Sequence, residues 1–248
     1  MNQIVSGTDY LTLPRPAQTW LIEPLIPAGG TALVYGPPKV GKSVAAMQMA
    51  AAVVTKSDWL GYPARTQGPV VYVQLDNPRS LWADRLKEAS PRIPGLLDVM
   101  QTDRELLDTY PTFDILNTQH SDILTVALRE VNPVLVVVDT LIKSHSAKEN
   151  DPTEMTAVIA RLTAAVRPAA LLIVAHNKKP PTNDEWKPSV IHDNRGASSV
   201  VGEMDGIISV HKTSFSIVGR AIEDTDFTAW LEGEGHHPIM WHRGKKPG

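Results

Sequence analysis

The sequence reads Gly36-Pro37-Pro38-Lys39-Val40-Gly41-Lys42-Ser43 between an apolar run, residues 31–35, and an Ala/Met/Val-rich run that extends to residue 56. This octapeptide matches the Walker A pattern at every fixed position. Its glycines let successive backbone N–H groups turn inward around phosphate oxygens, at a helix N-terminus that favours anions. The octapeptide therefore predicts a phosphate-binding loop between a strand and a helix.

The chemistry of such a loop assigns roles to its side chains. Lys42 would neutralise the β- and γ-phosphates, and the hydroxyl of Ser43 would bind Mg²⁺. We therefore expect ATP and Mg²⁺ as ligands. The residues expected to bind the nucleotide form one continuous segment: Gly36, Pro37, Pro38, Lys39, Val40, Gly41, Lys42, Ser43 and Val44.

Apolar runs alternate with amphipathic runs along the rest of the chain. Residues 134–138 are five consecutive Val/Leu residues, which is typical of a strand covered by helices on both faces of a parallel sheet. Asp151 followed by Pro152 predicts a helix start, because Asp caps helices and proline fits the first helical position. The chain thus predicts a one-domain α/β fold, with a mostly parallel sheet flanked by helices and a short antiparallel C-terminal meander. The expected strands are 31–35, 70–75, 96–101, 134–138, 171–175, 206–211, 215–221 and 228–231, and the expected helices are 42–56, 80–89, 120–131 and 152–166.

Two carboxylates follow predicted strands. A P-loop needs a second group to hold Mg²⁺ at the carboxyl end of a neighbouring parallel strand, and Asp139 follows the strand 134–138. Asp76 follows the strand 70–75, the expected place of a general base that activates water. The alternatives are structural: Asp139 could cap a turn, and Asp76 could cap the helix that begins after Pro78.

A fourth strand, 171–175, ends at His176 and Asn177. These side chains could hydrogen-bond the γ-phosphate and report its loss on hydrolysis. The alternative for His176 is an ordinary structural histidine.

Composition excludes several classes of protein. The 248 residues contain 24 Lys+Arg against 27 Asp+Glu, so no global basic excess indicates a nucleic-acid partner. The sequence has no cysteine, which excludes disulfides, thiolate zinc sites and cysteine nucleophiles. The apolar run 169–175 is too short to span a bilayer, so we expect a cytoplasmic location and no membrane partner.

Together these segments resemble the RecA-like P-loop ATPases, and more closely the RepA-like group of hexameric replicative helicases of plasmids and phages. The resemblance covers residues 25–220 and rests on an ordered set of motifs besides Walker A. These are Leu25-Ile26-Pro27-Ala28-Gly29-Gly30, Tyr72-Val73-Gln74-Leu75-Asp76-Asn77-Pro78, Val138-Asp139-Thr140-Leu141, His176-Asn177-Lys178-Lys179 and Arg195-Gly196-Ala197-Ser198-Ser199. It implies a RecA-like P-loop NTPase core, a homo-oligomer in the form of a hexameric ring, and single-stranded DNA as partner.

The resemblance also implies a catalytic arginine supplied by a neighbouring subunit. Arg220, at the end of a late strand, and Arg195 are the two candidates. The family usually carries Glu where this chain has Asp76, whose side chain is one methylene shorter. The carboxylate of Asp76 must therefore lie closer to the attacking water.

In a ring, the loop after the strand 171–175 would face the pore. Lysines there could follow a single-strand backbone, and an aromatic ring could stack on a base. The expected nucleic-acid-binding residues are Lys178, Lys179, Trp186, Lys187 and Arg195; the alternative is a solvated surface loop. We expect residues 236–248 to be a flexible basic tail.

The sequence thus predicts an N-terminal lead segment, residues 1–24, an ATPase domain, residues 25–235, and the tail. The expected function is an ATP-hydrolysing motor on single-stranded DNA, a helicase or translocase that works with replication or recombination proteins. The alternatives are a phage-type RecA-like recombination or annealing ATPase, a P-loop small-molecule kinase, and a non-hydrolysing nucleotide switch.

Overall fold

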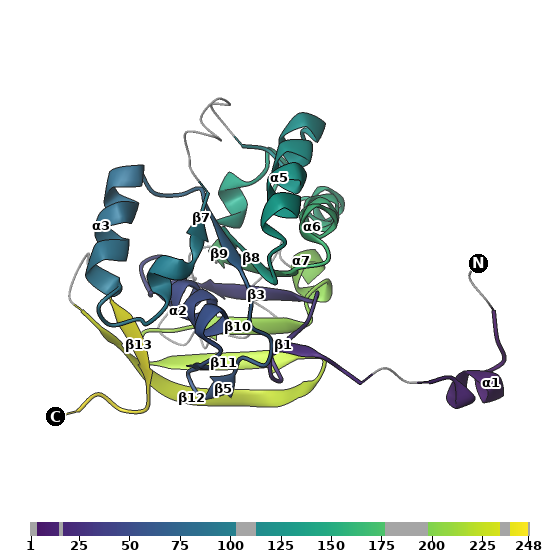
Figure 1. The fold of residues 1–248 in the computed structure, drawn as a ribbon, viewed down its shortest axis with the longest axis horizontal. Coiled ribbons are helices and arrows are strands. Elements are labelled where there is room, and N and C mark those ends of the chain that lie inside the picture. Colours follow the sequence, from purple (N-terminus) through teal and green to yellow (C-terminus); the bar gives the residue numbers. More distant parts are fainter. Residues whose placement is uncertain (1–3, 15–16, 103–112, 177–197, 234–238, 248) are drawn as a thin grey trace.

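The computed structural model of the chain describes residues 4–14, 17–102, 113–176, 198–233 and 239–247. At its centre is a nine-stranded sheet (Figure 1). In spatial order its strands are β13 (Met240–Arg243), β12 (Ile222–Glu232), β11 (Ser214–Gly219), β10 (Gly206–Val210), β3 (Thr31–Gly36), β9 (Ala170–His176), β8 (Leu135–Asp139), β6 (Val70–Gln74) and β7 (Met100–Gln101). Strands β10 to β7 are parallel, and β11, β12 and β13 are antiparallel.

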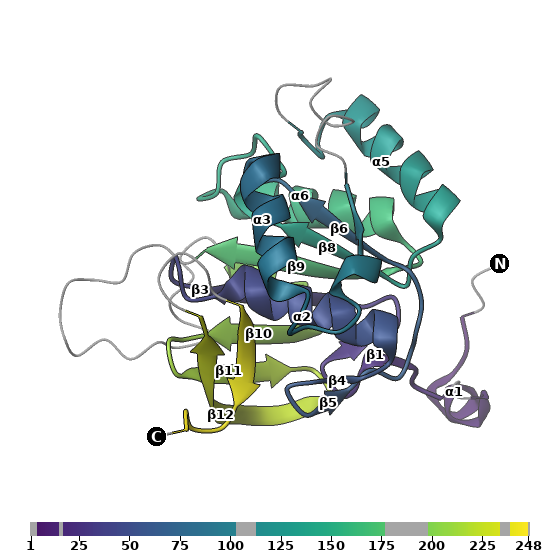
Figure 2. The same ribbon diagram turned by 60° about the vertical axis from the view of Figure 1, so that its left-hand side comes forward.

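Helices cover both faces of the parallel strands (Figure 2). One face packs against α2 (Lys42–Thr55) and α3 (Arg79–Ala89), and the other against α5 (Thr118–Val131), α6 (Pro152–Val166) and α7 (Ser198–Gly202). Along β8, Leu135 and Val137 join the first apolar cluster, whereas Val136 and Val138 join the second. The prediction of a strand buried on both faces is therefore confirmed, as is the α/β fold with its antiparallel end.

The predicted helix start at residue 152 is confirmed in detail. The carboxylate of Asp151 accepts hydrogen bonds from the backbone N–H groups of Thr153, at 2.9 Å, and Glu154, at 3.2 Å. The helix α5 begins at Thr118, two residues before the expected start, because Asn117 caps it by accepting from the N–H groups of Gln119 and His120. Side-chain caps thus define where both helices begin.

The predicted strand 96–101 is wrong over most of its length. Leu96–Asp98 forms a 3-10 turn, η1, and only Met100–Gln101 pairs with β6. Gly95 enters this turn with φ +78°, and the N–H of Val99 bonds back to the carbonyl of Leu96 at 3.3 Å. The segment therefore uses locally a backbone donor that a strand would have given to its neighbour.

The expectation of a flexible tail at residues 236–248 is wrong for Met240–Arg243. These residues form β13 and pair antiparallel with β12, from Ala229 opposite Arg243 to Glu232 opposite Met240. The physical reason is Trp241, which is 1% exposed and packs edge-on against Phe215 at a centroid distance of 4.9 Å. Burying this indole outweighs the solvation of the polar residues around it.

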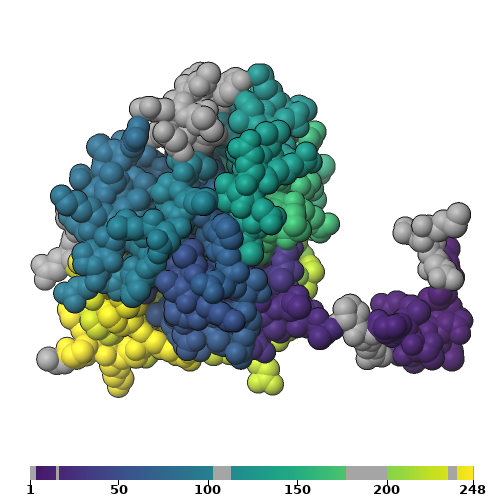
Figure 3. Space-filling model, in the orientation of Figure 1, coloured from purple at the N-terminus to yellow at the C-terminus, as the bar shows by residue number. Residues whose placement is uncertain are grey.

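The N-terminal lead divides in two. The helix α1 (Gly7–Thr12) has no buried residue and extends away from the body of the molecule (Figure 3). By contrast, β1 (Trp20–Ile22) pairs with β2 (Ile26–Pro27), and Leu21 and Ile22 are buried in the main core. The core therefore begins near residue 20 and not at residue 25. A second short hairpin, β4 (Asp58–Trp59) and β5 (Tyr62–Pro63), follows α2. No helix in the described ranges is both long enough and apolar enough to cross a membrane.

Candidate nucleotide site

The predicted phosphate loop lies between β3 and α2, at the carboxyl edge of the parallel strands. Gly41 occupies the N-cap position of α2 with φ +90°, a conformation that favours glycine. At Gly36 a methyl group would collide with the carbonyl oxygen of Val210 on the adjacent strand β10. The two fixed glycines of the motif are thus required by backbone conformation and by close packing.

Lys42 is buried within the loop that it serves. Its side-chain nitrogen Nζ donates to the carbonyl oxygen of Pro37 at 2.7 Å, and the residue is 3% exposed. Burial lowers the pKa of Lys42 to about 8, although the carboxylates of Asp139 and Asp76 oppose this shift. An ammonium that is poorly solvated and held by one carbonyl is prepared to exchange that carbonyl for a phosphate oxygen.

The two predicted Mg²⁺ ligands face each other across the loop. Asp139, at the end of β8, is 2% exposed, and burial raises its pKa. Hydrogen bonds from the side chains of Tyr72 and Ser43 counteract that shift, and the Tyr72 hydroxyl donates to Asp139 Oδ2 at 2.7 Å. One hydroxyl and one carboxylate at this position form the oxygen donor set that Mg²⁺ shares with nucleotide phosphates in P-loop sites. The described residues contain no group of three or more His, Cys, Asp or Glu that could hold a metal ion without the nucleotide.

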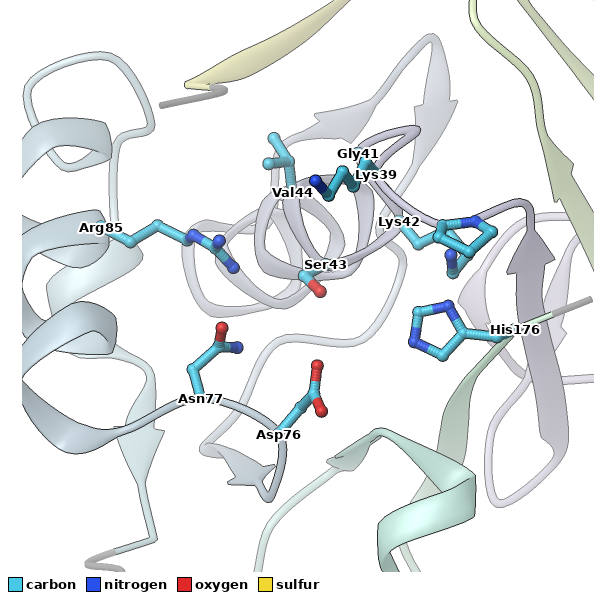
Figure 4. Close-up of a pocket in the computed structure, with 10 residues that line it drawn as sticks. Lys39, Gly41, Lys42, Ser43, Val44, Asp76, Asn77, Arg85 and His176 are labelled. Atoms are coloured by element: carbon cyan, nitrogen blue, oxygen red, sulfur yellow. The ribbon is translucent and has the colours of Figure 1, made fainter. Parts of the chain in front are cut away.

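Asp76 lies two residues beyond the end of β6. The helix after it begins at Arg79, and its N-cap position is occupied by Pro78 without a side-chain cap. The structure therefore does not place Asp76 at the capping position that the alternative interpretation required. Its carboxylate instead lines the cavity beside Ser43 and Lys42 (Figure 4).

His176 is the last residue of β9 and lies opposite Gly36 in the strand register. Burial lowers its pKa, and the positive charge of Lys42 lowers it further, although Asp76, Asp139 and Glu149 oppose the shift. The imidazole is therefore neutral at neutral pH, so one ring nitrogen can donate a hydrogen bond and the other can accept. Asn177, the other predicted sensor, lies outside the described residues.

These groups surround a cavity of about 370 Å³. Two of its lining residues were not predicted, Asn77 and Arg85. Arg85 extends from α3 toward Ser43 (Figure 4), and its guanidinium carbon lies 5.8 Å from the centre of the Trp82 ring. An arginine on an amphipathic helix is usually solvated, so its only signal was its position on the helix that follows Asp76. The cavity is lined by Pro38, Lys39, Gly41, Lys42, Ser43, Val44, Asp76, Asn77, Arg85 and His176.

Tyr72 was also missed as a site residue. It is fully buried on β6, and burial together with the charge of Asp139 raises the pKa of its hydroxyl. A signal existed in the sequence, because a tyrosine within a run of valines must find a hydrogen-bond partner when it is buried. A carboxylate at the end of the adjacent strand was the nearest candidate.

The structure does not bring Arg220 to this cavity. Arg220 follows β11 at the opposite, amino edge of the sheet, where Gly206 pairs with both Ala32 and Gly219. Its guanidinium contacts Asp205 Oδ1 at 3.3 Å and the carbonyl of Gly202 at 2.9 Å. Arg195 and the predicted DNA-binding residues Lys178, Lys179, Trp186 and Lys187 lie outside the described residues.

Comparison with known proteins identifies the family of this chain. The profile of a family described as "AAA domain" matches residues 5–182, so the chain belongs to that family and is an AAA-type ATPase domain. A solved structure of the ATPase domain of a helicase is similar to this chain with a TM-score of 0.61 and 13% sequence identity, covering 85% of this chain and 84% of the other. No curated protein matches the sequence. The resemblance to the RecA-like P-loop ATPases, and to the replicative-helicase group among them, is confirmed at the level of family and fold.

Proposed function

We propose that this ATPase domain is a Mg²⁺-dependent, ATP-hydrolysing motor that acts on single-stranded DNA, as a replicative helicase or translocase does. One observation carries the ATPase part. Ser43 and Asp139 meet at the carboxyl edge of the sheet, beside Lys42, and Asp76 faces them across one cavity. Fold alone does not name a substrate, since 607 solved chains match this one. The DNA part of the proposal therefore rests on the resemblance of the motifs.

In this proposal each side chain has one task. Asp76 accepts the proton of the water that attacks the γ-phosphate in line, and Lys42 stabilises the charge that develops on the phosphate oxygens. Bound Mg²⁺, held by Ser43 and Asp139, would offset further negative charge. The neutral imidazole of His176 is placed to hydrogen-bond the γ-phosphate.

Assembly follows from the position of Arg220. An arginine that completes the site must reach a phosphate, yet Arg220 projects from the edge of the sheet opposite its own phosphate loop. It can therefore serve only the site of another copy. A ring in which each carboxyl edge meets the next copy's amino edge satisfies this requirement at every site, and we propose a hexamer.

The experiment that tests this function measures ATP hydrolysis with and without single-stranded DNA, alongside the mass of the particle with nucleotide. We expect hydrolysis that DNA stimulates, from an oligomer. A monomer whose hydrolysis is indifferent to DNA would contradict the motor. The double variant Trp186→Ala, Lys178→Ala should weaken single-strand binding about tenfold or more, since base stacking on an aromatic side chain contributes about 1–3 kcal/mol.

A further inference from the structure

The C-terminal strand β13 contacts the phosphate loop directly. The indole nitrogen Nε1 of Trp241 donates to the carbonyl oxygen of Gly41 at 3.0 Å. The same oxygen accepts the N–H of Ala45, also at 3.0 Å, in the first turn of α2. A methyl group on Gly41 would lie 2.9 Å from Trp241 Nε1 and 2.9 Å from Leu231 Cδ2. The β12–β13 hairpin thus packs against the loop at its second fixed glycine.

Trp241 is itself fixed from two further directions. The side-chain amide of Gln48, on α2, accepts from the backbone N–H of Trp241 at 2.7 Å and donates to its carbonyl at 3.0 Å. The ring packs at 82° against Phe215. Its donor atom therefore has little freedom to move relative to α2, so the position of the Gly41 carbonyl depends on this strand.

We infer that Trp241 is a positioning residue for the phosphate loop. Its indole N–H holds the Gly41 carbonyl so that the N–H groups at the start of α2 face the phosphates before a nucleotide arrives. The carbonyl of Gly41 already accepts from Ala45, so the second bond orients it and is not needed to satisfy it. Preorganised donors bind their ligand without the cost of ordering the loop. This inference rests on the nucleotide binding proposed above.

The molecule contains a matched control. Trp59 on β4 is also 1% exposed, donates its indole N–H to a carbonyl of α2, that of Ala45, at 3.0 Å, and packs on Phe215 at 83°. Ala45 lies one turn into α2, outside the phosphate loop. Both indoles therefore make the same kind of bond to the same helix, and only that of Trp241 reaches the loop.

The test compares Trp241→Phe with Trp59→Phe in the full chain. The affinity for ADP is measured by the anisotropy of a ribose-labelled nucleotide excited outside the tryptophan band. We expect Trp241→Phe to weaken binding about fivefold and to raise the KM for ATP equally, with kcat within about twofold. Trp59→Phe should change affinity less than about twofold, while both lower the unfolding temperature to a similar extent.

Equal losses of affinity in the two variants, or none at Trp241→Phe, would overturn the inference. Failure of the unsubstituted protein to bind nucleotide would instead contradict the proposed function. A second measurement needs no substitution, should Trp241→Phe not fold. Hydrogen exchange of the Trp241 indole N–H should slow on adding ADP, and that of Trp59 should not; unchanged exchange at Trp241 would also overturn the inference.

Discussion

The two edges of the parallel strands differ in how they hold their charges. At the carboxyl edge, Lys42 and Asp139 are almost completely buried, and burial moves the pKa of each toward its neutral form. At the amino edge, Asp205 and Arg220 form an ion pair in which the arginine side chain is 63% exposed. Charges that are desolvated by the fold gather where chemistry is expected, whereas the other edge presents a solvated cation.

The amino edge is nevertheless well ordered. The carboxylate of Asp205 accepts from the backbone N–H of Thr31 at 2.9 Å, and the backbone N–H of Arg220 bonds to the Asp205 carbonyl at 3.0 Å. The arginine is therefore anchored to the start of β3, the strand whose other end carries the phosphate loop. The comparison indicates that one edge receives a nucleotide and that the other edge serves the nucleotide of another copy.

The largest effect should come from Arg220→Ala. An arginine supplied in trans contributes about a thousandfold or more to kcat, so hydrolysis should fall by that factor while ADP affinity is retained. Steady-state ATPase assays and nucleotide titrations measure the two quantities.

A mixing experiment locates the effect of Arg220. Arg220→Ala subunits keep an intact phosphate loop, and Lys42→Ala subunits keep an intact arginine, so mixed assemblies should recover part of the activity. If mixing restores nothing, the division of labour between the two edges is wrong.

The next effect should be that of Asp76→Asn. Loss of a general base lowers kcat by about a hundredfold or more, and ATP binding should survive because the phosphate loop is unchanged. Asp122→Asn, on the exposed face of α5, is the control and should leave kcat unchanged. Equal activity in both variants would remove Asp76 from the chemistry and restrict it to a structural role.

A smaller effect should follow pH. Phosphates favour the charged form of Lys42, whose pKa in the free protein is about 8, so the full affinity for ADP is present below this pH. Above it, affinity should fall by up to about tenfold per pH unit, because binding must then restore the proton. Calorimetry near about pH 9 in two buffers of different ionisation enthalpy should show net proton uptake on binding. An affinity that is flat from neutral pH to this value would contradict the burial of this ammonium.

The smallest effect should be that of Tyr72→Phe, which removes the hydroxyl that donates to Asp139. The carboxylate loses a charge-assisted hydrogen bond, so the unfolding free energy should fall by about 1.5–3 kcal/mol. The Mg²⁺ concentration for half-maximal hydrolysis should rise several-fold, most at acidic pH, because the pKa of Asp139 rises further. Denaturant melts and Mg²⁺ titrations test the two expectations separately.

The parts of the site that the sequence predicts are those defined locally. Lys42 and Ser43 occupy fixed places in one octapeptide, and Asp139 and His176 end strands whose apolar runs are visible in the chain. The carboxyl ends of parallel strands meet at one edge, so adjacency follows from topology. The same logic predicts most of the fold, including the order of strands and helices along the chain.

The rest depends on contacts that no local pattern encodes. Trp241 is 200 residues from Gly41, and Tyr72 is 67 from Asp139. Their partners are decided by how the completed layers pack. Arg85 looks like any solvated helix residue until α3 is placed against the loop. The prediction for the tail is wrong for the same reason, since one buried indole decides the position of β13.

The sheet ends on very short strands at both rims. β7 has two residues and β13 has four, so each outer rim offers few unpaired backbone groups for another strand to join. Long free edges are templates for aggregation, and short ones resist it. Copies of this domain can therefore crowd together at high local concentration and meet through side chains, with little risk of fusing into a continuous sheet.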